Sequence, residues 1–414
     1  MISKKLVAAS ILAAMGTSAH AIGFKAGEWE MDISGSVNAY YTSTSCDNVG
    51  DGAGIFTGNG TALHPCGIDA TNGVDKQNIQ NGLLPGFIIF SASTTQKGYD
   101  LKAVISIDPG TSTDGGTSSA LGSGNLSDAG GGRGQIVGDQ RRVYFSVGNA
   151  TMGTVKAGRD IGLFGQNAIL NDMSLLAVGG GSAFNGALNT TLGSIGSGYV
   201  YTQFQPQITY TTPAIGNLSV SAGAFQPVAR NASVTGDREL GFQGLATYSL
   251  GDMGKLWGAF ISQGNEQTNT NAPVADISGF EVGGTLNFGS LGLTANYFTG
   301  DGLGTALIGF GGSDALAQER ESQGYLVQAT YKVGDTKFGV NYGVSSLDAT
   351  ANDRATATRI LDESEQLTLG VYHNLTPSLT IAGEYITNTV KYQLGGPTQD
   401  AESDTIAIGA ILFF

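Results

Sequence analysis

The sequence predicts an all-β protein, a transmembrane antiparallel β-barrel of about sixteen strands. Three observations support this prediction. Short segments of alternating apolar and polar residues recur along the chain, and the connections between them alternate between tight turns and long loops. The first 21 residues have the features of an export signal. The last segment, from Asp404 to Phe414, reads as a strand that is apolar on one face and ends on an aromatic residue.

The closing strand carries the most information. Side chains on a strand alternate between its two faces, so one face of this strand carries Ile406, Ile408, Ala410, Leu412 and Phe414, and the other carries Ala407, Gly409, Ile411 and Phe413. An edge strand of a soluble sandwich is the alternative interpretation. The pattern resembles the closing strand of outer-membrane β-barrels, and that resemblance implies that Phe414 is the signal read by the barrel assembly machinery.

The N-terminus agrees with export. Lys4 and Lys5 precede the short apolar run 6–15, and Ser18–Ala21 supplies a cleavage site before Ile22. No later stretch reaches the ~18 apolar residues of a transmembrane helix. Only helices and closed barrels satisfy their backbone groups in hydrocarbon, so an exported chain of this kind crosses a membrane as a barrel. We therefore expect a signal peptide over 1–21 and a barrel over 22–414.

The charge balance excludes one class of partner. The chain has 20 Lys and Arg and 34 Asp and Glu, and removal of residues 1–21 takes away Lys4 and Lys5 and no acid, which leaves 18 basic against 34 acidic residues and a net charge of −16. A net acidic chain without clustered basic residues does not suit nucleic acid.

The predicted strands follow one another with Gly, Pro, Asn and Asp in the turns. They are 28–41, 84–95, 99–107, 141–147, 154–160, 203–211, 218–224, 240–250, 256–263, 278–288, 293–299, 323–333, 337–345, 365–374, 379–389 and 404–414. Short turns at one end and long loops at the other are typical of outer-membrane barrels, in which the long loops are extracellular. A barrel this wide encloses water, so the polar face should line a pore.

Aromatic residues near the strand ends fit the girdles that such barrels place at the membrane interfaces. These are Trp29, Tyr41, Tyr210, Trp257, Phe288 and Phe414.

The segment after the fifth strand resembles a known family. Gly158-Arg159-Asp160-Ile161-Gly162, followed by Asn171-Asp172-Met173, is similar to the third-loop region of the trimeric general diffusion porins of Gram-negative bacteria. The resemblance implies a homotrimer in the outer membrane, in contact with lipopolysaccharide, and a third loop over 161–199 that folds into the lumen. It also implies that Arg159 and Asp172 belong to the pore constriction.

Alternation along the strands predicts the other inward charges. Strict alternation places Asp160 inside and Arg159 outside, which is costly in lipid, so either the strand bulges near Gly158 or this wall is buried in a trimer interface. We expect Arg142 and Lys102 near the constriction, with Arg141 in the outward phase. The expected pore-lining residues are Glu28, Glu30, Asp32, Asp100, Glu281, Lys332 and Glu384.

One departure from the family bears on selectivity. No acid lies between Asp172 and Asp237, and no base lies between Arg159 and Arg230. The inserted loop is therefore nearly neutral, and because acids outnumber bases on the inward face we expect a channel that mildly prefers cations.

The two cysteines, Cys46 and Cys66, fall in one long loop of an exported chain, so a disulfide is the expected state. His64 is near, but one His and two Cys do not make a closed metal site. We expect no cofactor apart from Ca²⁺ or Mg²⁺ at the acidic stretches 362–365 and 400–404, which could equally be solvated loops.

Enzymatic function has little support, because the mature chain has only His64 and His373 and no nucleophile motif. The expected function is a passive channel for small hydrophilic solutes and ions. A substrate-specific channel and a surface adhesion or binding barrel are the alternatives.

Overall fold

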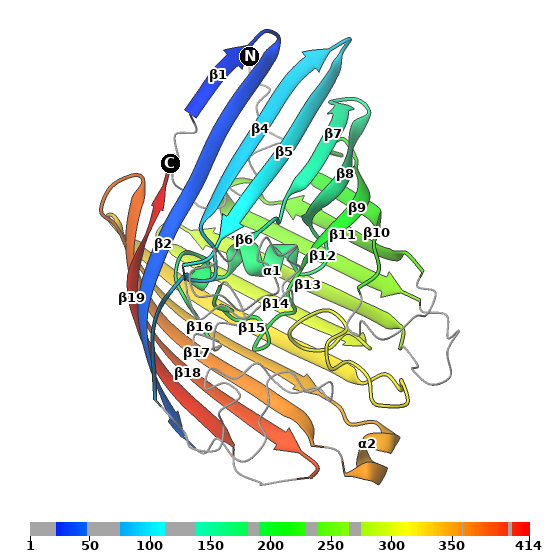
Figure 1. Ribbon diagram of the computed structural model, residues 1–414, viewed down its shortest axis with the longest axis vertical. Helices are drawn as coiled ribbons and strands as arrows, with labels where there is room; N and C mark the ends of the chain where they lie inside the picture. Colours follow the sequence, from blue (N-terminus) through cyan, green and yellow to red (C-terminus); the bar gives the residue numbers. More distant parts are fainter. Residues whose placement is uncertain are drawn as a thin grey trace.

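The computed structural model of the protein describes residues 22–47, 75–111, 138–180, 190–228, 239–264, 275–357, 359–395 and 400–414. These residues form a closed barrel of 16 antiparallel strands (Figure 1). Consecutive ring strands pair with each other, and the last strand, β19, pairs with the first, β2. Closure leaves no unpaired sheet edge. The backbone N–H and C=O groups of the two edges that meet therefore have hydrogen-bond partners, as a sheet surrounded by hydrocarbon requires.

The ring confirms the predicted strands. It consists of β2 (Trp29–Asp47), β4 (Phe87–Gln96), β5 (Tyr99–Pro109), β7 (Val143–Asn149), β8 (Gly153–Ile161), β9 (Phe204–Thr211), β10 (Leu218–Phe225), β11 (Gly241–Ser249), β12 (Gly254–Gln263), β13 (Ile277–Phe288), β14 (Leu291–Asp301), β15 (Glu321–Val333), β16 (Thr336–Leu347), β17 (Ile360–Asn374), β18 (Leu379–Gln393) and β19 (Ala401–Phe413).

Three short strands add to the ring and were not predicted. β1 (Ile22–Ala26) pairs with β2, β3 (Lys76–Gln80) extends the pairing of β2 at its other end, and β6 (Gly138–Asp139) pairs with β5. The turn between β1 and β2 holds Gly27 and Glu28, so the first ring strand begins at Trp29 rather than at Glu28. β2 also continues to Asp47, beyond the predicted end at residue 41.

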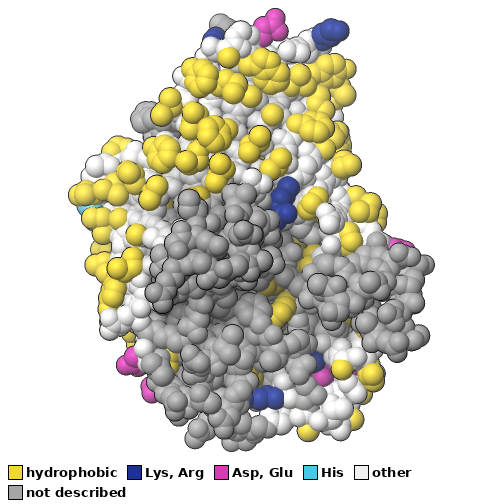
Figure 2. Space-filling view, in the orientation of Figure 1, with side chains coloured by type: hydrophobic (Ala, Val, Ile, Leu, Met, Phe, Trp, Pro, Cys, Tyr) yellow, Lys and Arg dark blue, Asp and Glu magenta, His cyan; other side chains and the backbone are white. Residues whose placement is uncertain are grey.

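The two faces of the wall differ as alternation predicts. In β19 the side chains of Ile406 and Ile408 are 60% and 57% exposed, whereas Ala407 between them is buried. We call the face of the exposed apolar side chains the outer face and the opposite face the inner face. Figure 2 shows apolar side chains gathered over the strands in the upper part of the view. Such a large exposed apolar surface is stable only against lipid or another apolar surface.

The chain end is tied into the closing seam. Gly35 and Phe414 exchange two backbone hydrogen bonds, with N···O distances of 2.9 and 3.0 Å. A Cβ at Gly35 would lie 2.5 Å from the ring of Phe414, so glycine is needed there. On the inner side, Ile411 and Phe413 pack with Phe87. The terminal aromatic therefore lies against the start of the first ring strand.

Three of the six predicted girdle aromatics, Tyr41, Tyr210 and Phe288, are exposed on the outer face. Trp257 is an exception. It is buried on the inner face and donates from Nε1 to Glu281 Oε1 at 3.0 Å. It follows the inward phase of β12, opposite to its exposed neighbour Leu256.

Helices are few and short in the part of the chain that the structure describes. They are α1 (Gln166–Asn171), α2 (Ala351–Thr356) and the 3₁₀ turns η2 (Met173–Leu176) and η3 (Gly251–Met253). Among the described residues, no helix has the length and apolar character needed to cross a membrane.

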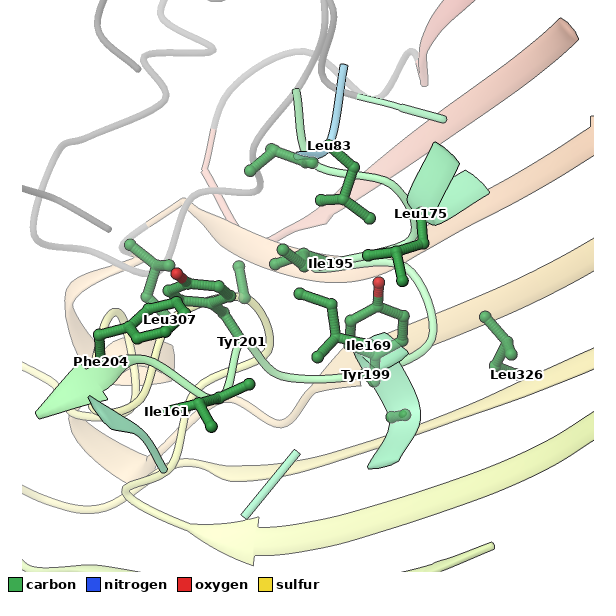
Figure 3. Close-up of a cluster of buried hydrophobic side chains, with 13 residues drawn as sticks. Leu83, Ile161, Ile169, Leu175, Ile195, Tyr199, Tyr201, Phe204, Leu307 and Leu326 are labelled. Carbon is green, nitrogen blue, oxygen red and sulfur yellow. The ribbon is translucent and has the colours of Figure 1, made fainter. Parts of the chain in front are cut away.

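An apolar cluster occupies part of the space against the inner face (Figure 3). It joins Ile169 and Leu175 from the segment after β8, Tyr199 and Tyr201 from the segment before β9, and Leu307 from the β14–β15 connection. The polar inner face of the wall led us to expect an aqueous interior. The loops instead bring their own apolar side chains, which bury one another.

Candidate functional site

The candidate site is the segment between β8 and β9, of which the structure describes 162–180 and 190–203. It leaves β8 through Gly165, whose φ of 76° favours glycine. The chain then forms α1 and η2 and returns to β9 at Phe204. Polar side chains of the inner face bind its backbone at several places.

Asp172 is the central tether. Its Oδ1 accepts from the backbone N of Ser174 at 2.9 Å and from Nδ2 of Asn341 in β16 at 3.3 Å. Its Oδ2 accepts from the backbone N of Ser194 at 3.0 Å and from the hydroxyl of Tyr199 at 2.7 Å. Asp172 is buried, so its charge is satisfied by neutral donors and is not presented to solvent. One carboxylate thus joins both halves of the segment to the wall.

Glu384 of β18 is a second tether. Its Oε2 accepts from the backbone N atoms of Val178 and Gly179 at 2.9 and 2.7 Å, and its Oε1 accepts from the Tyr372 hydroxyl at 2.6 Å. The Tyr40 hydroxyl of β2 donates to the carbonyl of Leu176. The carboxylate predicted to line the pore is therefore occupied in holding the segment.

Amide side chains of the inner face complete the attachment. Gln328 of β15 accepts from Met173 N at 2.7 Å and donates to the carbonyl of Asn171 at 3.1 Å. Gln366 of β17 donates to the Gly193 carbonyl at 2.9 Å. Gln243 of β11 accepts from the backbone of Leu163 and Phe164. An amide can donate and accept at once, which suits it to a backbone whose N–H and C=O groups both need partners.

The segment approaches the wall closely at glycines. A Cβ at Gly343 of β16 would lie 1.9 Å from the Ser197 carbonyl oxygen, and one at Gly180 would lie 2.1 Å from Oε1 of Gln366. Any larger residue at these positions would force the segment and the wall apart. The close contact therefore depends on a glycine in the wall, Gly343, and on one in the segment, Gly180.

A second connection, 302–320 between β14 and β15, packs against the first. Tyr201 N donates to the carbonyl of Ala306 at 2.8 Å. Arg320 locks this connection, since it is 1% exposed and binds Asp353 of α2 through two bonds, Nε to Oδ2 at 2.8 Å and a terminal guanidinium N to Oδ1 at 2.7 Å. Arg320 also donates to the carbonyls of Gly311 and Ser313. The sequence analysis did not anticipate this element.

A charged corner lies where β8 enters the segment. Asp160 is buried and binds Lys156 Nζ at 2.6 Å, and Nε of Arg142 lies 3.8 Å from it. The guanidinium groups of Arg141 and Arg142 lie 5.5 and 5.4 Å from the ring centre of Phe204. Arg142 and Asp160 thus meet on the inner side of the wall, and their place in a constriction stays a prediction. Arg141 was predicted to face outward and is instead buried beside Phe204, because it precedes β7 and its backbone N donates to Asp108, so strand alternation does not govern it.

Arg159 lies in the outward phase. It pairs directly with Val143 and Pro206, both of which are exposed. Gly158 has a positive φ of 127°, yet the pairing of β8 runs in continuous register past it. The pairing thus places Arg159 in the outward phase of β8.

The remaining predicted charges are spread over the inner face. Lys102 lies opposite Ser93 and Ser146, and Lys332 lies opposite Lys337. Asp32 lies opposite Ser91, while Glu30 and Asp100 are exposed near the turns. Glu281 is buried against Trp257, and Glu28 lies in the β1–β2 turn outside the ring strands.

Three other predictions concern residues near the loops. Cys46 is buried and is not a free thiol, while Cys66 lies outside the described residues, so their pairing stays a prediction. His373 shares a hydrogen bond with Thr336 at 2.9 Å near a tight turn. At the acidic stretches Lys391 binds Glu363 at 2.6 Å and also binds Glu365, and over the described ranges no group of three or more potential ligands is placed to hold a metal.

Sequence reasoning missed the amides. Gln243, Gln328, Asn341 and Gln366 carry neither charge nor a motif, and their role depends on the backbone that meets them. The available signal was their phase, because each sits on the inward face of its strand. The arrangement as a whole can obstruct and shape a passage, and the groups that it brings together are hydrogen-bonding tethers.

Comparisons agree with this geometry. The family model described as Gram-negative porin matches residues 8–392. No curated protein matches the chain in sequence. Among solved structures, the outer membrane channel DcaP of Acinetobacter baumannii is similar with a TM-score of 0.65 and 13% identity, over 95% of this chain and 99% of that chain.

Two further structures show the same fold. The anion-selective porin from Comamonas acidovorans has a TM-score of 0.61 and 15% identity, over 94% of this chain and 100% of that chain. The Salmonella typhi OmpF complex with daunomycin has a TM-score of 0.58 and 12% identity, over 95% and 100%. With the family model spanning nearly the whole chain and the closed 16-strand ring in place, this protein belongs to the Gram-negative porin family.

Proposed function

We propose that this porin is a passive diffusion channel of the outer membrane for small hydrophilic solutes and ions, and that residues 161–199 narrow its lumen. The observation that carries the proposal is the tethering of this segment to inner-face side chains of β11, β15, β16, β17 and β18. A segment held from one part of the ring to another crosses the interior and leaves a restricted passage.

The narrowing is steric rather than electrostatic. The tethers are amides, hydroxyls and two carboxylates whose oxygens accept hydrogen bonds from the segment. Neutral walls discriminate by size, whereas a dense ladder of charges would select by sign. We therefore propose only a mild ionic preference.

That ionic preference is for cations and arises at the end of the barrel that carries the long loops. The net charge of the mature chain is −16, from 18 basic and 34 acidic residues. Exposed acids such as Asp47, Asp301, Glu321 and Glu402 stand where the strands enter the long loops. Such a rim raises the local cation concentration.

Bilayer recording tests the proposal directly. The refolded chain is added to a planar bilayer in 1 M KCl, and discrete ohmic steps are expected. A KCl gradient should then give a reversal potential on the cation side, and it should shrink at high salt because the Debye length falls to ~3 Å at 1 M. A correctly folded protein that inserts without conducting would refute the channel and leave the binding or adhesion barrel.

A substrate-specific channel is the second candidate. A cavity next to the segment is lined by Leu84, Phe87 and Phe204 on its apolar side and by Arg141 and Arg142 on its polar side. Apolar walls with a few convergent polar groups are typical of ligand sites. In liposome swelling, a marked preference for organic anions over sugars of equal size would favour this candidate.

We further propose a homotrimer with the wall around Arg159 in the subunit interface. Its outward phase, beside the exposed Val143 and Phe145, places a guanidinium on an apolar surface, which lipid tolerates poorly. The remaining outer face would contact lipid and, at the loop end, lipopolysaccharide.

A further inference from the structure

Three basic residues lie on the inner face of neighbouring strands, near the point where β8 enters the segment between β8 and β9. They are Lys102 of β5, Arg142 directly before β7, and Lys156 of β8. We call these three residues the wall bases. Lys102 and Lys156 both stand opposite Ser146 of β7, so only a small side chain lies between the two like charges. A group of this kind, left without a counter-charge, would attract anions to this part of the interior.

One carboxylate lies among all three wall bases. Asp160 of β8 accepts from Lys156 Nζ through Oδ2 at 2.6 Å, and Nε of Arg142 lies 3.8 Å from its Oδ1. The charge of Lys102 interacts with Asp32 of β2 and with Asp160. The counter-charge of the wall bases therefore comes mainly from the same wall and not from the segment.

Gly158 allows Lys156 to reach Asp160. It is the inward position between these two residues on β8, and it has no side chain. A Cβ at Gly158 would lie 2.6 Å from the Cα atom of Tyr144. The lysine side chain can therefore extend along the strand over the glycine, and its ammonium lies 5.5 Å from the ring centre of Tyr144. The ion pair thus follows from the spacing of acid, glycine and base on one strand.

The acid is less exposed than the two bases that it contacts. The side chain of Asp160 is 8% exposed, whereas those of Arg142 and Lys156 are 12% and 21% exposed. Oδ1 of Asp160 is buried and accepts no hydrogen bond from the described residues. An ion in the interior can approach the bases more closely than the acid. Asp160 therefore acts by reducing the charge of the bases and not by binding cations itself.

The other described charges on this part of the inner face do not replace Asp160. They are Arg141, Asp108, Glu30 and Asp100. The first two contribute one charge of each sign, and the last two are exposed near the tight turns. Asp100 stands in the ladder row of Thr154, six residues before Asp160 on β8, which is about 20 Å at the rise of a strand and about two Debye lengths at 0.1 M salt. Loss of Asp160 would leave the three wall bases with Asp32 alone.

We propose that Asp160 sets the sign of the ion preference of the channel, because it neutralises the wall bases from within their own wall. This rests on the proposed function as a channel. With Asp160 in place, the acidic rim at the long loops decides a mild preference for cations. Without Asp160, the wall bases attract anions beside the segment, where Asp172 is occupied by its own hydrogen bonds.

Reversal potentials of Asp160→Asn in a planar bilayer test the proposal. The substitution keeps the size of the side chain and removes one negative charge. Under a KCl gradient with about 0.1 M on the dilute side, the ratio of cation to anion permeability should fall about threefold to tenfold, which Coulomb's law in water gives for one charge at about 6 Å with and without screening. The reversal potential should approach zero or change sign.

Two further variants separate the charge of Asp160 from its position in the fold. Asp252→Asn is the matched control, because it removes the same charge from the exposed turn between β11 and β12. Its permeability ratio should stay within about twofold of the unaltered channel, because screening weakens distant charges. Lys156→Gln combined with Asp160→Asn should restore the original preference, because one acid and one base are then lost together. A purely structural role of Asp160 would not give this restoration.

Each variant should first show the heat-dependent mobility of the folded barrel on gels. If Asp160→Asn does not fold, Lys156→Gln alone gives the test, since it should shift the permeability ratio towards cations by a similar factor. An unmoved ratio in the conducting variant used, an equal shift in Asp252→Asn, or a double variant that stays anionic would overturn the proposal and leave the channel intact. A folded, unaltered protein that inserts without conducting would refute the proposed function, and this proposal with it.

Discussion

Asp172→Asn should release the segment between β8 and β9 from the wall while the barrel remains closed. Each carboxylate oxygen of Asp172 accepts two hydrogen bonds, Oδ1 from Ser174 and Asn341 and Oδ2 from Ser194 and Tyr199. The amide that replaces the carboxylate keeps one oxygen and puts an NH₂ group in place of the other. Whichever way it turns, its NH₂ group faces the backbone N–H of Ser174 or of Ser194, which cannot accept, whereas the Tyr199 hydroxyl can turn to accept.

The magnitude follows from the number of partners lost. A buried donor left without an acceptor costs about 1–3 kcal/mol, and one backbone N–H is left so in either orientation. The ring ladder does not pass through Asp172, so this loss falls on the segment and not on strand pairing. A segment weakened by this amount should open locally, as low-stability elements do.

Single-channel recording measures the release. Asp172→Asn should show larger current noise and more frequent transitions between conductance levels, at an unchanged heat-dependent mobility of the barrel on gels. The matched control is Tyr199→Phe, which removes one of the four donors and leaves the carboxylate with three. Its noise should stay near that of the unaltered channel. If Asp172→Asn were as quiet as the control, the tethering argument would fail.

Three further predictions concern other parts of the chain. Burial raises the pKa of Asp353, but hydrogen bonds from Arg320 and Thr350 and the charge of Arg320 outweigh this and hold the pKa below its usual value. The stability that the pair contributes is therefore present above the unfolded carboxyl pKa of ~3.9 and is lost as pH falls through the lower folded value. Proteolysis of 302–320 should rise at strongly acid pH, and in Asp353→Asn it should be raised already at neutral pH. Cys46 and Cys66 should be bonded, worth ~3 kcal/mol in the chain-entropy model, so neither should react with maleimide before reduction, and labelling of both in the intact protein would contradict the pairing. Unheated protein in mild detergent should migrate as a trimer that collapses on boiling, and a monomer under those conditions would count against the subunit interface.

The alternation of side chains is a local property, and it was sufficient for the wall. Ile406 and Ile408 are exposed and Ala407 is buried because a period of two fixes the face of each residue once the strand exists. The same rule placed Lys332 and Glu384 inside and Arg159 outside. The even strand number and the closing strand follow from that pattern along the whole chain.

Outside the strands, alternation does not determine where a side chain points. Arg141 was assigned by phase, but it lies before β7, where a hydrogen bond to Asp108 and the ring of Phe204 decide its direction. The strand phase of Trp257 did hold, and its burial was missed only because its position near a strand end suggested an interface.

The sequence by itself determined the barrel and the two faces of its wall. Only the tertiary structure decided how the segment between β8 and β9 is attached to that wall. Asp172 was expected to act as a pore charge and accepts hydrogen bonds that hold the segment, and the only signal of Gln328 and Gln366 was their inward phase. The reason is physical, because a hydrogen bond between residues more than a hundred positions apart depends on where closure of the ring brings them, and no local period encodes that meeting.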